Sequence, residues 1–127
     1  MIQHKTILKV VDNSGARTAQ CIRVLGGYKK RFGIIGDFIL VSIKSLRIKI
    51  NKLKLKVQKK SVFKAIIIQT KYFNKKNIGF NIKFKDNAII LIDKQNNPLA
   101  SRIKCFVLEK LKIRFYKLIS ISLNYIN

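Results

Sequence analysis

The stretch VVDNSGARTAQCIRVLGG at residues 10–27 restricts the fold more than any other part of the chain. Val10 and Val11 end one run of β-forming residues, and a second run extends over residues 18–25. Residues 12–15 between them, DNSG, cap turns through their side chains or tolerate a positive φ. Gly26 and Gly27 then stop the pattern. The sequence therefore predicts two strands joined by a tight turn, with a loop directly after the second.

Further apolar runs extend this β pattern. We expect four strands before residue 71, at 6–11, 19–25, 38–43 and 62–70. The last two are almost entirely apolar and rich in branched side chains, which favours strands that are buried on both faces or curled into a small barrel. Residues 82–84 and 88–92 are expected to pair as a hairpin around a turn at 85–87.

Residues 44–60 alternate apolar and basic side chains, with a change of phase at residues 51–52. A period of two predicts a basic β-ribbon with a turn or bulge at the change of phase. A helix is the alternative, because residues 46, 50, 53 and 57 also have helical spacing. Ile48 and Leu55 would then lie on the polar face, which favours the ribbon.

The composition changes at residues 93–98, DKQNNP, which are typical of a loop. We expect this loop to separate a barrel at about 1–97 from a tail at about 98–127, within a single domain. Short apolar spacings in the tail predict two short helices, at 108–112 and 115–121.

Positive charge dominates the composition: 28 Lys and Arg face 5 Asp and Glu, which leaves a net charge of +23, although 48% of the residues are apolar. A folded body so charged repels itself unless a polyanion neutralises it, so nucleic acid is the expected partner. An anionic membrane is the rival, but membrane binding would need an amphipathic or spanning helix that the strand pattern does not offer. The opening MIQHKTIL enters a strand pattern directly, and we expect no import signal there.

Little in the sequence supports catalysis. The five acids are scattered, His4 is the only histidine, and Cys21 and Cys105 lie far apart, so no triad, zinc spacing or redox pair can be assembled. Both cysteines are expected to be buried, as free cysteines usually are. Gly26 and Gly27 lack the spacing of a phosphate loop. We expect neither an enzyme nor a cofactor or metal.

Basic residues beside aromatic ones mark candidate RNA contacts, because exposed rings can stack on bases while cations meet phosphates. Tyr28 and Phe32 flank one such cluster, and Tyr72 and Phe73 lie in another. Solvated lysines are the alternative for each. The cations in these two loops and on the 44–60 segment are Lys29, Lys30, Arg31, Lys54, Lys56, Lys59, Lys60, Lys71, Lys75 and Lys76. Arginine binds phosphate through two parallel hydrogen bonds, which adds Arg17 and Arg102 to the candidates.

The sequence resembles the universal large-subunit ribosomal protein L-fourteen family. The similarity is most specific in DNSGAR at 12–17 and CIRVLGG at 21–27, and it continues through KAIII at 64–68, SRI at 101–103 and FYKLIS at 115–120. It implies a mainly β fold, a small five-stranded β-barrel with β-hairpin extensions and short C-terminal helices. It also implies a structural role on large-subunit rRNA, bridges to small-subunit rRNA, a contact with the neighbouring protein L-nineteen, and a surface for a ribosomal silencing factor.

The resemblance and the residue patterns together give two sets of candidate residues. Expected RNA contacts are Asn13, Ser14, Arg17, Lys29, Lys30, Arg31, Lys44, Arg47, Lys54, Lys59, Lys60, Lys71, Lys75, Lys76 and Arg102. Expected inter-subunit or factor-facing residues are Arg102, Lys104, Lys110, Arg114 and Lys117. We expect no homo-oligomer. A free nucleic-acid chaperone with a similar barrel is the alternative, and it would be found largely unattached to ribosomes.

The chain departs from the family pattern in three places, one of which is LEKL at 108–111, where the family has a more Arg-rich helix. Residues 46–60 lack the usual Pro and Gly, and Ala100 and Cys105 stand where the family has glycines around its Arg-Ile pair. This drift, together with a composition typical of an A+T-rich genome, predicts an organelle-encoded protein. A mitochondrial ribosome is the expected location, and a relict plastid is the alternative.

Overall fold

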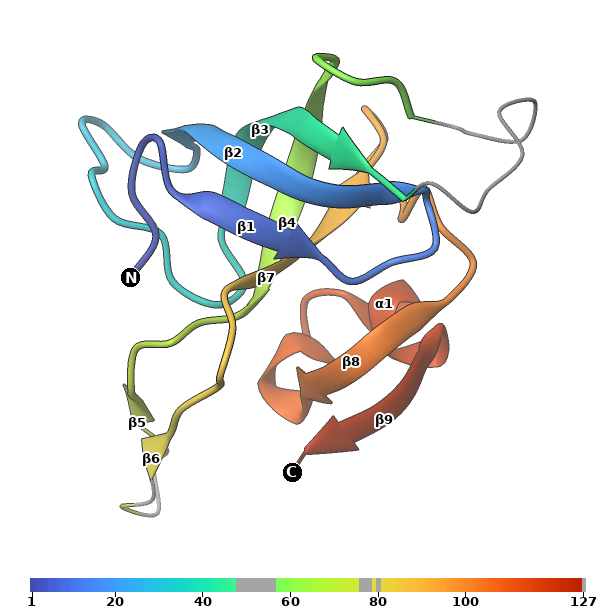
Figure 1. The fold of residues 1–127 in the computed structure, drawn as a ribbon. Coiled ribbons are helices and arrows are strands. Elements are labelled where there is room, and N and C mark those ends of the chain that lie inside the picture. Colours follow the sequence, from blue (N-terminus) through green and yellow to red (C-terminus); the bar gives the residue numbers. More distant parts are fainter. Residues whose placement is uncertain (48–56, 76–78, 80, 127) are drawn as a thin grey trace.

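The computed structural model describes residues 1–47, 57–75, 79 and 81–126. Five strands form a closed barrel in the order β1-β2-β3-β4-β7 (Figure 1). Their bounds are Ile7–Val10 for β1, Ala16–Val24 for β2, Phe38–Leu46 for β3, Val62–Gln69 for β4 and Ala88–Ile92 for β7. All neighbours pair antiparallel except β1 and β7, which pair in parallel and close the barrel. The mainly β fold with a five-stranded barrel is confirmed.

Two apolar clusters explain why some strands alternate and others do not. The first fills the barrel, where Leu8 and Val10 of β1 alternate with exposed residues of the same strand. The second lies between the outer face of β4 and β7 and the C-terminal part of the chain, and it includes Ile68 and Ile90. Because both of their faces are covered, all five residues of β7 and the last five of β4 are buried.

The predicted turn at residues 12–15 is confirmed, and it connects β1 to β2. Gly15 has a φ of 102°, a left-handed conformation that glycine adopts without steric cost. At the far end of β2, Gly26 has a φ of 89° and starts the loop that carries the first aromatic and basic cluster. The two ends of β2 therefore present the two segments that the sequence marks as candidate contacts.

The predicted hairpin between residues 82–84 and 88–92 is wrong. Strand β6, Asn81–Ile82, pairs instead with β5, Asn74–Lys75, and together they project from the barrel (Figure 1). Asn87, at the end of the expected turn, bonds instead to residues that are distant in the sequence. The Asn87 carbonyl accepts from the Lys9 amide at 2.9 Å, and the Asn87 side chain accepts from the Lys71 amide at 2.8 Å. Asn87 thus holds the start of β7 beside β1 and the end of β4.

The C-terminal part contains two strands that the local pattern does not predict. Strands β8, Ile103–Leu108, and β9, Ser122–Ile126, pair in parallel below the barrel (Figure 1). Between them lie the 3₁₀ helix η2, Glu109–Leu111, and the α-helix α1, Tyr116–Ser120. The helix expected at 115–121 is confirmed as one short helix, whereas the one expected at 108–112 is wrong, because only a single 3₁₀ turn forms there.

The expected ribbon at residues 44–60 falls largely outside the described residues, so ribbon and helix both stay predictions for 48–56. At the N-terminal end of this segment, β3 extends to Leu46. At the C-terminal end of the segment, Val57 is buried in the barrel core, and the Lys60 amide donates to the Ile43 carbonyl at 2.9 Å. In the part of the chain that the structure describes, no helix has the length and apolar character needed to cross a membrane.

Candidate nucleic-acid interface

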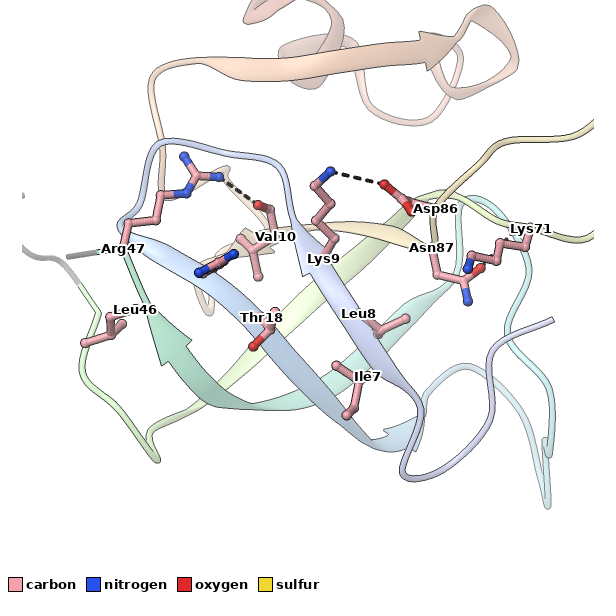
Figure 2. Close-up of a pocket in the computed structure, with 11 residues that line it drawn as sticks. Ile7, Leu8, Lys9, Val10, Thr18, Leu46, Arg47, Lys71, Asp86 and Asn87 are labelled. Carbon is pink, nitrogen blue, oxygen red and sulfur yellow. Dashed lines mark hydrogen bonds and ion pairs between the residues drawn. The ribbon is translucent and has the colours of Figure 1, made fainter. Parts of the chain in front are cut away.

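A cleft of about 830 Å³ opens above β1 and the start of β2, and four basic side chains line it. Lys9 comes from β1 and Arg17 from β2, whereas Arg47 directly follows β3 and Lys71 lies two residues after β4. Asp86 is the one acid among its lining residues. The remaining lining residues are Ile7, Leu8, Val10, Thr18, Leu46 and Asn87. Segments far apart in the sequence therefore bring cations to one concave surface (Figure 2).

Two of the four cations in this cleft have partners within the protein (Figure 2). Lys9 Nζ lies 3.1 Å from Asp86 Oδ2, and this hydrogen bond and charge lower the pKa of the Asp86 carboxyl below its ordinary value. The half-buried Arg47 donates from Nη2 to the Val10 carbonyl at 2.9 Å, which fixes the guanidinium against the rim. Within the described residues, the exposed side chains of Arg17 and Lys71 make no hydrogen bond or ion pair.

The 12–15 turn uses its polar side chains inside the protein. The Asp12 carboxylate is fully buried and accepts from three donors: the Ser14 amide at 2.9 Å, the Ser14 hydroxyl, and the Leu91 amide at 2.9 Å. Ser14 is itself buried, with 4% of its surface exposed. The Leu91 bond links the turn to the neighbouring strand β7, and the Ser14 hydroxyl is already occupied by its bond to Asp12.

Asn13 is exposed but also has internal partners. Its side-chain oxygen accepts from the amides of Ser101 at 3.1 Å and Arg102 at 3.3 Å, while its side-chain nitrogen donates to the Ser101 hydroxyl at 3.1 Å. The Asn13 amide donates to the Arg102 carbonyl at 3.2 Å. Asn13 therefore fastens the start of the C-terminal part to the turn. The RNA contacts expected at Asn13 and Ser14 stay predictions.

The loop after β2 presents its side chains differently. Tyr28 is 91% exposed, and Lys29 Nζ lies 5.2 Å from the centroid of its ring. Lys30 Nζ lies 2.8 Å from Asp37 Oδ2 and is partly buried, whereas Arg31 is exposed without a hydrogen-bond partner among the described residues. Of the three cations expected here, the structure leaves Lys29 and Arg31 facing solvent.

The second aromatic and basic cluster surrounds the β5–β6 hairpin. Tyr72 and Phe73 are 53% and 57% exposed, and Lys83 Nζ lies 5.0 Å from the Phe73 centroid. Lys75 is in β5, and Lys76 lies outside the described residues. Lys83 here and Lys9 in the main cleft are not among the contacts predicted from the sequence. Both lysines lie in short segments where apolar residues alternate with other residues, as in a strand with one exposed face. This alternation is the signal that could have placed their side chains on an outer face.

The cations around the 44–60 segment are dispersed. Lys44 points outward from β3, and Lys59 and Lys60 are exposed where the chain returns to the barrel. Among the members of this group that the structure describes, only Arg47 lines the main cleft. Lys54 and Lys56 lie outside the described residues.

The five cations expected to face the small subunit or a factor are all exposed. Arg102 and Lys104 lie at the start of β8, and Lys110 and Arg114 line a groove of about 410 Å³ next to η2. Lys117 lies in α1 and donates from Nζ to Asn97 Oδ1 at 2.9 Å. Arg102 thus sits beside the 12–15 turn, apart from the groove that Lys110 and Arg114 share.

The described residues contain no group of three or more His, Cys, Asp or Glu side chains placed to hold a metal ion. Cys21 is buried in the barrel and Cys105 is partly buried against the second apolar cluster. Burial raises the pKa of both thiols, that of Cys105 to about 11. Neither cysteine is therefore a reactive thiolate at neutral pH.

The chain was compared with models of known protein families. The model for ribosomal protein L14p/L23e matches residues 1–126. The match covers the barrel and the C-terminal part together, including the turn, the main cleft and α1.

Proposed function

Because the chain belongs to the ribosomal protein L14p/L23e family, structural and non-enzymatic proteins of the large ribosomal subunit, we propose that it binds large-subunit rRNA through the cleft above β1. The observation that carries this proposal is the supply of cations in that cleft. Within the described residues, the exposed side chains of Arg17 and Lys71 make no hydrogen bond, while the single acid lining the cleft, Asp86, is held by Lys9. The cleft thus offers an excess of positive charge to a phosphate backbone.

The arrangement of the cleft favours contacts to the RNA backbone over contacts to base edges. Arg47 is fixed by its bond to Val10, so it presents a positive charge without first losing side-chain freedom. Arg17 has a free guanidinium that can hold one phosphate with two hydrogen bonds. Such contacts set the position of a protein on RNA and depend strongly on salt.

The C-terminal part supports a second role in the same assembly. Arg102, Lys104, Lys110, Arg114 and Lys117 are exposed cations outside the main cleft. We infer that they face the small subunit, where they contribute to bridges with its rRNA, and that this surface also meets protein L-nineteen and a ribosomal silencing factor. The composition supports an organellar ribosome, that of the mitochondrion, as the setting.

The contribution of charge in the cleft can be tested with full-length protein and a transcript of large-subunit rRNA. Arg17→Ala and Lys71→Ala are each expected to weaken binding and to reduce the salt dependence by roughly 0.7 to 0.9 log units per tenfold change in salt. Lys94→Ala, which removes an exposed cation from the loop after β7, is the matched control. Variants with the affinity and salt slope of this control would contradict the proposal, provided that circular dichroism shows an intact fold.

The bridge can be tested separately in assembled ribosomes. Arg102→Glu should enter large subunits normally but weaken their association with small subunits, which sedimentation at decreasing Mg²⁺ concentration measures. Lys94→Glu supplies the same charge change on another loop. Equal association of the two variants would remove Arg102 from the bridge.

A further inference from the structure

A second cleft, of about 440 Å³, lies at the opposite end of β2 from the 12–15 turn, between the N-terminal segment and the loop after β2. We propose that it holds one unstacked nucleotide of the RNA, with the base against the Phe32 ring and the phosphate facing the guanidinium groups of Arg23 and Arg31. This inference rests on the proposed RNA-binding function and names the form of RNA that this site takes.

The walls of the cleft are fixed before any ligand arrives. The Ile2 amide donates to the Gly33 carbonyl at 3.0 Å, and the Gly33 amide donates to the Ile2 carbonyl at 2.7 Å, so the N-terminal segment and the loop are tied together. Figure 1 shows the two segments side by side. A Cβ at Gly33 would lie 2.7 Å from Ile67 Cδ1, so this tie packs closely on the barrel core.

The basic side of the cleft is anchored as well. Asp37 Oδ2 accepts from Lys30 Nζ at 2.8 Å and from the Ile34 amide at 2.9 Å, which holds the loop on both sides of Phe32. A site that is ordered in advance loses less conformational entropy when it binds. Phe32 and Arg31 therefore sit on a supported part of the loop.

An irregularity in β2 completes the cleft. The register between β2 and β3 shifts between Cys21 and Arg23. Ile22 is partly exposed and Arg23 is exposed, although neighbours in a regular strand point to opposite faces. Both side chains line the cleft, one as an apolar contact and one as a cation.

The mixture of lining groups indicates a nucleotide with a free base. Phe32 is 40% exposed, and beside it the cleft is lined by apolar Ile22 and by two arginines. Phosphates alone do not need an aromatic wall, and paired bases in a duplex do not offer their faces to one. An unpaired nucleotide uses both kinds of lining group, because its base can stack on the ring while its phosphate meets the arginines.

Phe32→Trp tests the contact directly, because the chain contains no other tryptophan. The full-length variant would be titrated with two RNA hairpins of equal length, one fully paired in its stem and one carrying a single bulged adenosine. We expect the bulged hairpin to bind about tenfold more tightly and to quench the indole emission, as stacking does. Tyr116→Trp, at a residue of α1 that is 72% exposed, is the control, and its emission should not distinguish the bulged hairpin from the paired one.

Phe32→Leu gives an independent result that needs no fluorophore. It keeps an apolar side chain but removes the ring, so the preference for the bulged hairpin should disappear while binding of the paired hairpin persists. If both hairpins shift in a mobility assay but neither quenches Phe32→Trp and Phe32→Leu keeps the preference, the nucleotide site is refuted and RNA binding stands. If neither hairpin nor large-subunit rRNA binds at all, the proposed function fails together with this site.

Discussion

The two ends of β2 carry very different kinds of polar surface. At one end, the 12–15 turn directs a buried carboxylate and a buried hydroxyl inward and bonds an exposed side-chain amide to the backbone of residues 101–102. At the other end, the loop after Gly26 leaves a tyrosine, a lysine and an arginine facing solvent. Both segments belong to the most specific part of the family resemblance or directly follow it. The short polar side chains of the turn bond to β7 and to residues 101–102, whereas of the loop's three cations Lys30 pairs with Asp37, and Lys29 and Arg31 face solvent.

A sequence motif can be characteristic of a family for two different reasons: it can determine the fold, or it can determine what the surface binds. DNSG forms a network that joins β1, β7 and the start of the C-terminal part, so its residues determine the fold. The loop contributes charge and flat rings, so its residues determine what the surface can bind. The predictions below test this division by measuring stability and RNA affinity on the same variants.

The largest expected effect is on Asp12. Replacing Asp12 with Ala leaves the amides of Ser14 and Leu91 without their buried acceptor, and the free energy of unfolding should fall by about 3 kcal/mol. Urea denaturation measures this change. Asp93→Ala, which removes an exposed carboxylate that accepts from the Lys94 amide and from no other described donor, should cost less than about 1 kcal/mol. Equal losses for the two variants would contradict the role of the buried network.

A smaller effect is expected at Asn13. Asn13→Ala removes three side-chain hydrogen bonds to Ser101 and Arg102, and because the site is exposed we expect a loss of about 1 kcal/mol. Affinity for large-subunit rRNA, measured at matched folded fraction, should change little. A large drop in affinity with unchanged stability would mean that Asn13, like the loop after β2, acts in RNA binding.

The loop should show the reverse behaviour. Arg31→Ala is expected to change the free energy of unfolding by no more than about 0.5 kcal/mol, because its side chain is exposed. Binding to rRNA should weaken, and its salt slope should fall by roughly 0.7 to 0.9 per lost phosphate contact. An Arg31→Ala variant that loses stability but retains its affinity for rRNA would mean that this residue supports the fold and not RNA binding.

The smallest effect concerns the strand between the two ends. Cys21 lies in β2 with 1% of its surface exposed, and burial raises the pKa of its thiol, so alkylation at pH 8 should be slow in the folded protein. Asp12→Ala should accelerate the reaction by freeing the turn end, whereas Arg31→Ala should not. Peptide mapping by mass spectrometry distinguishes Cys21 from Cys105. The same rate in both variants would mean that the two ends support β2 equally.

The barrel strands could be predicted from the sequence because each carries its own signal. Branched apolar residues mark β3 and β4, and the polar residues at 12–15 mark the turn before β2. The pairing of β7 could not be predicted in this way. Asp86 and Asn87 look like hairpin turn residues, yet their partners are Lys9 and Lys71, far away in the chain. Tertiary contacts of this kind leave no local pattern.

The C-terminal part shows the same limit. Residues 103–108 alternate only partly, because β8 lies against the apolar cluster outside the barrel and pairs in parallel with β9, beyond α1. At the candidate site, residue type alone predicted the cations Arg17 and Lys71. It could not reveal that Asn13 and Ser14 are engaged internally, or that Lys9 joins the main cleft, because these facts depend on which strands are neighbours.

The bond from the Leu91 amide to the Asp12 carboxylate joins residues that are 79 positions apart in the chain. During synthesis β1 to β4 are made before β7, and until β7 is placed the sheet has two open edges, β1 and β4, which only β7 joins among the described strands. Contacts between such distant residues make folding slow, and open edges invite wrong pairing. The Asp12 carboxylate therefore gains its last hydrogen-bond donor only when the final barrel strand has been made and placed, so this bond forms only in the closed barrel.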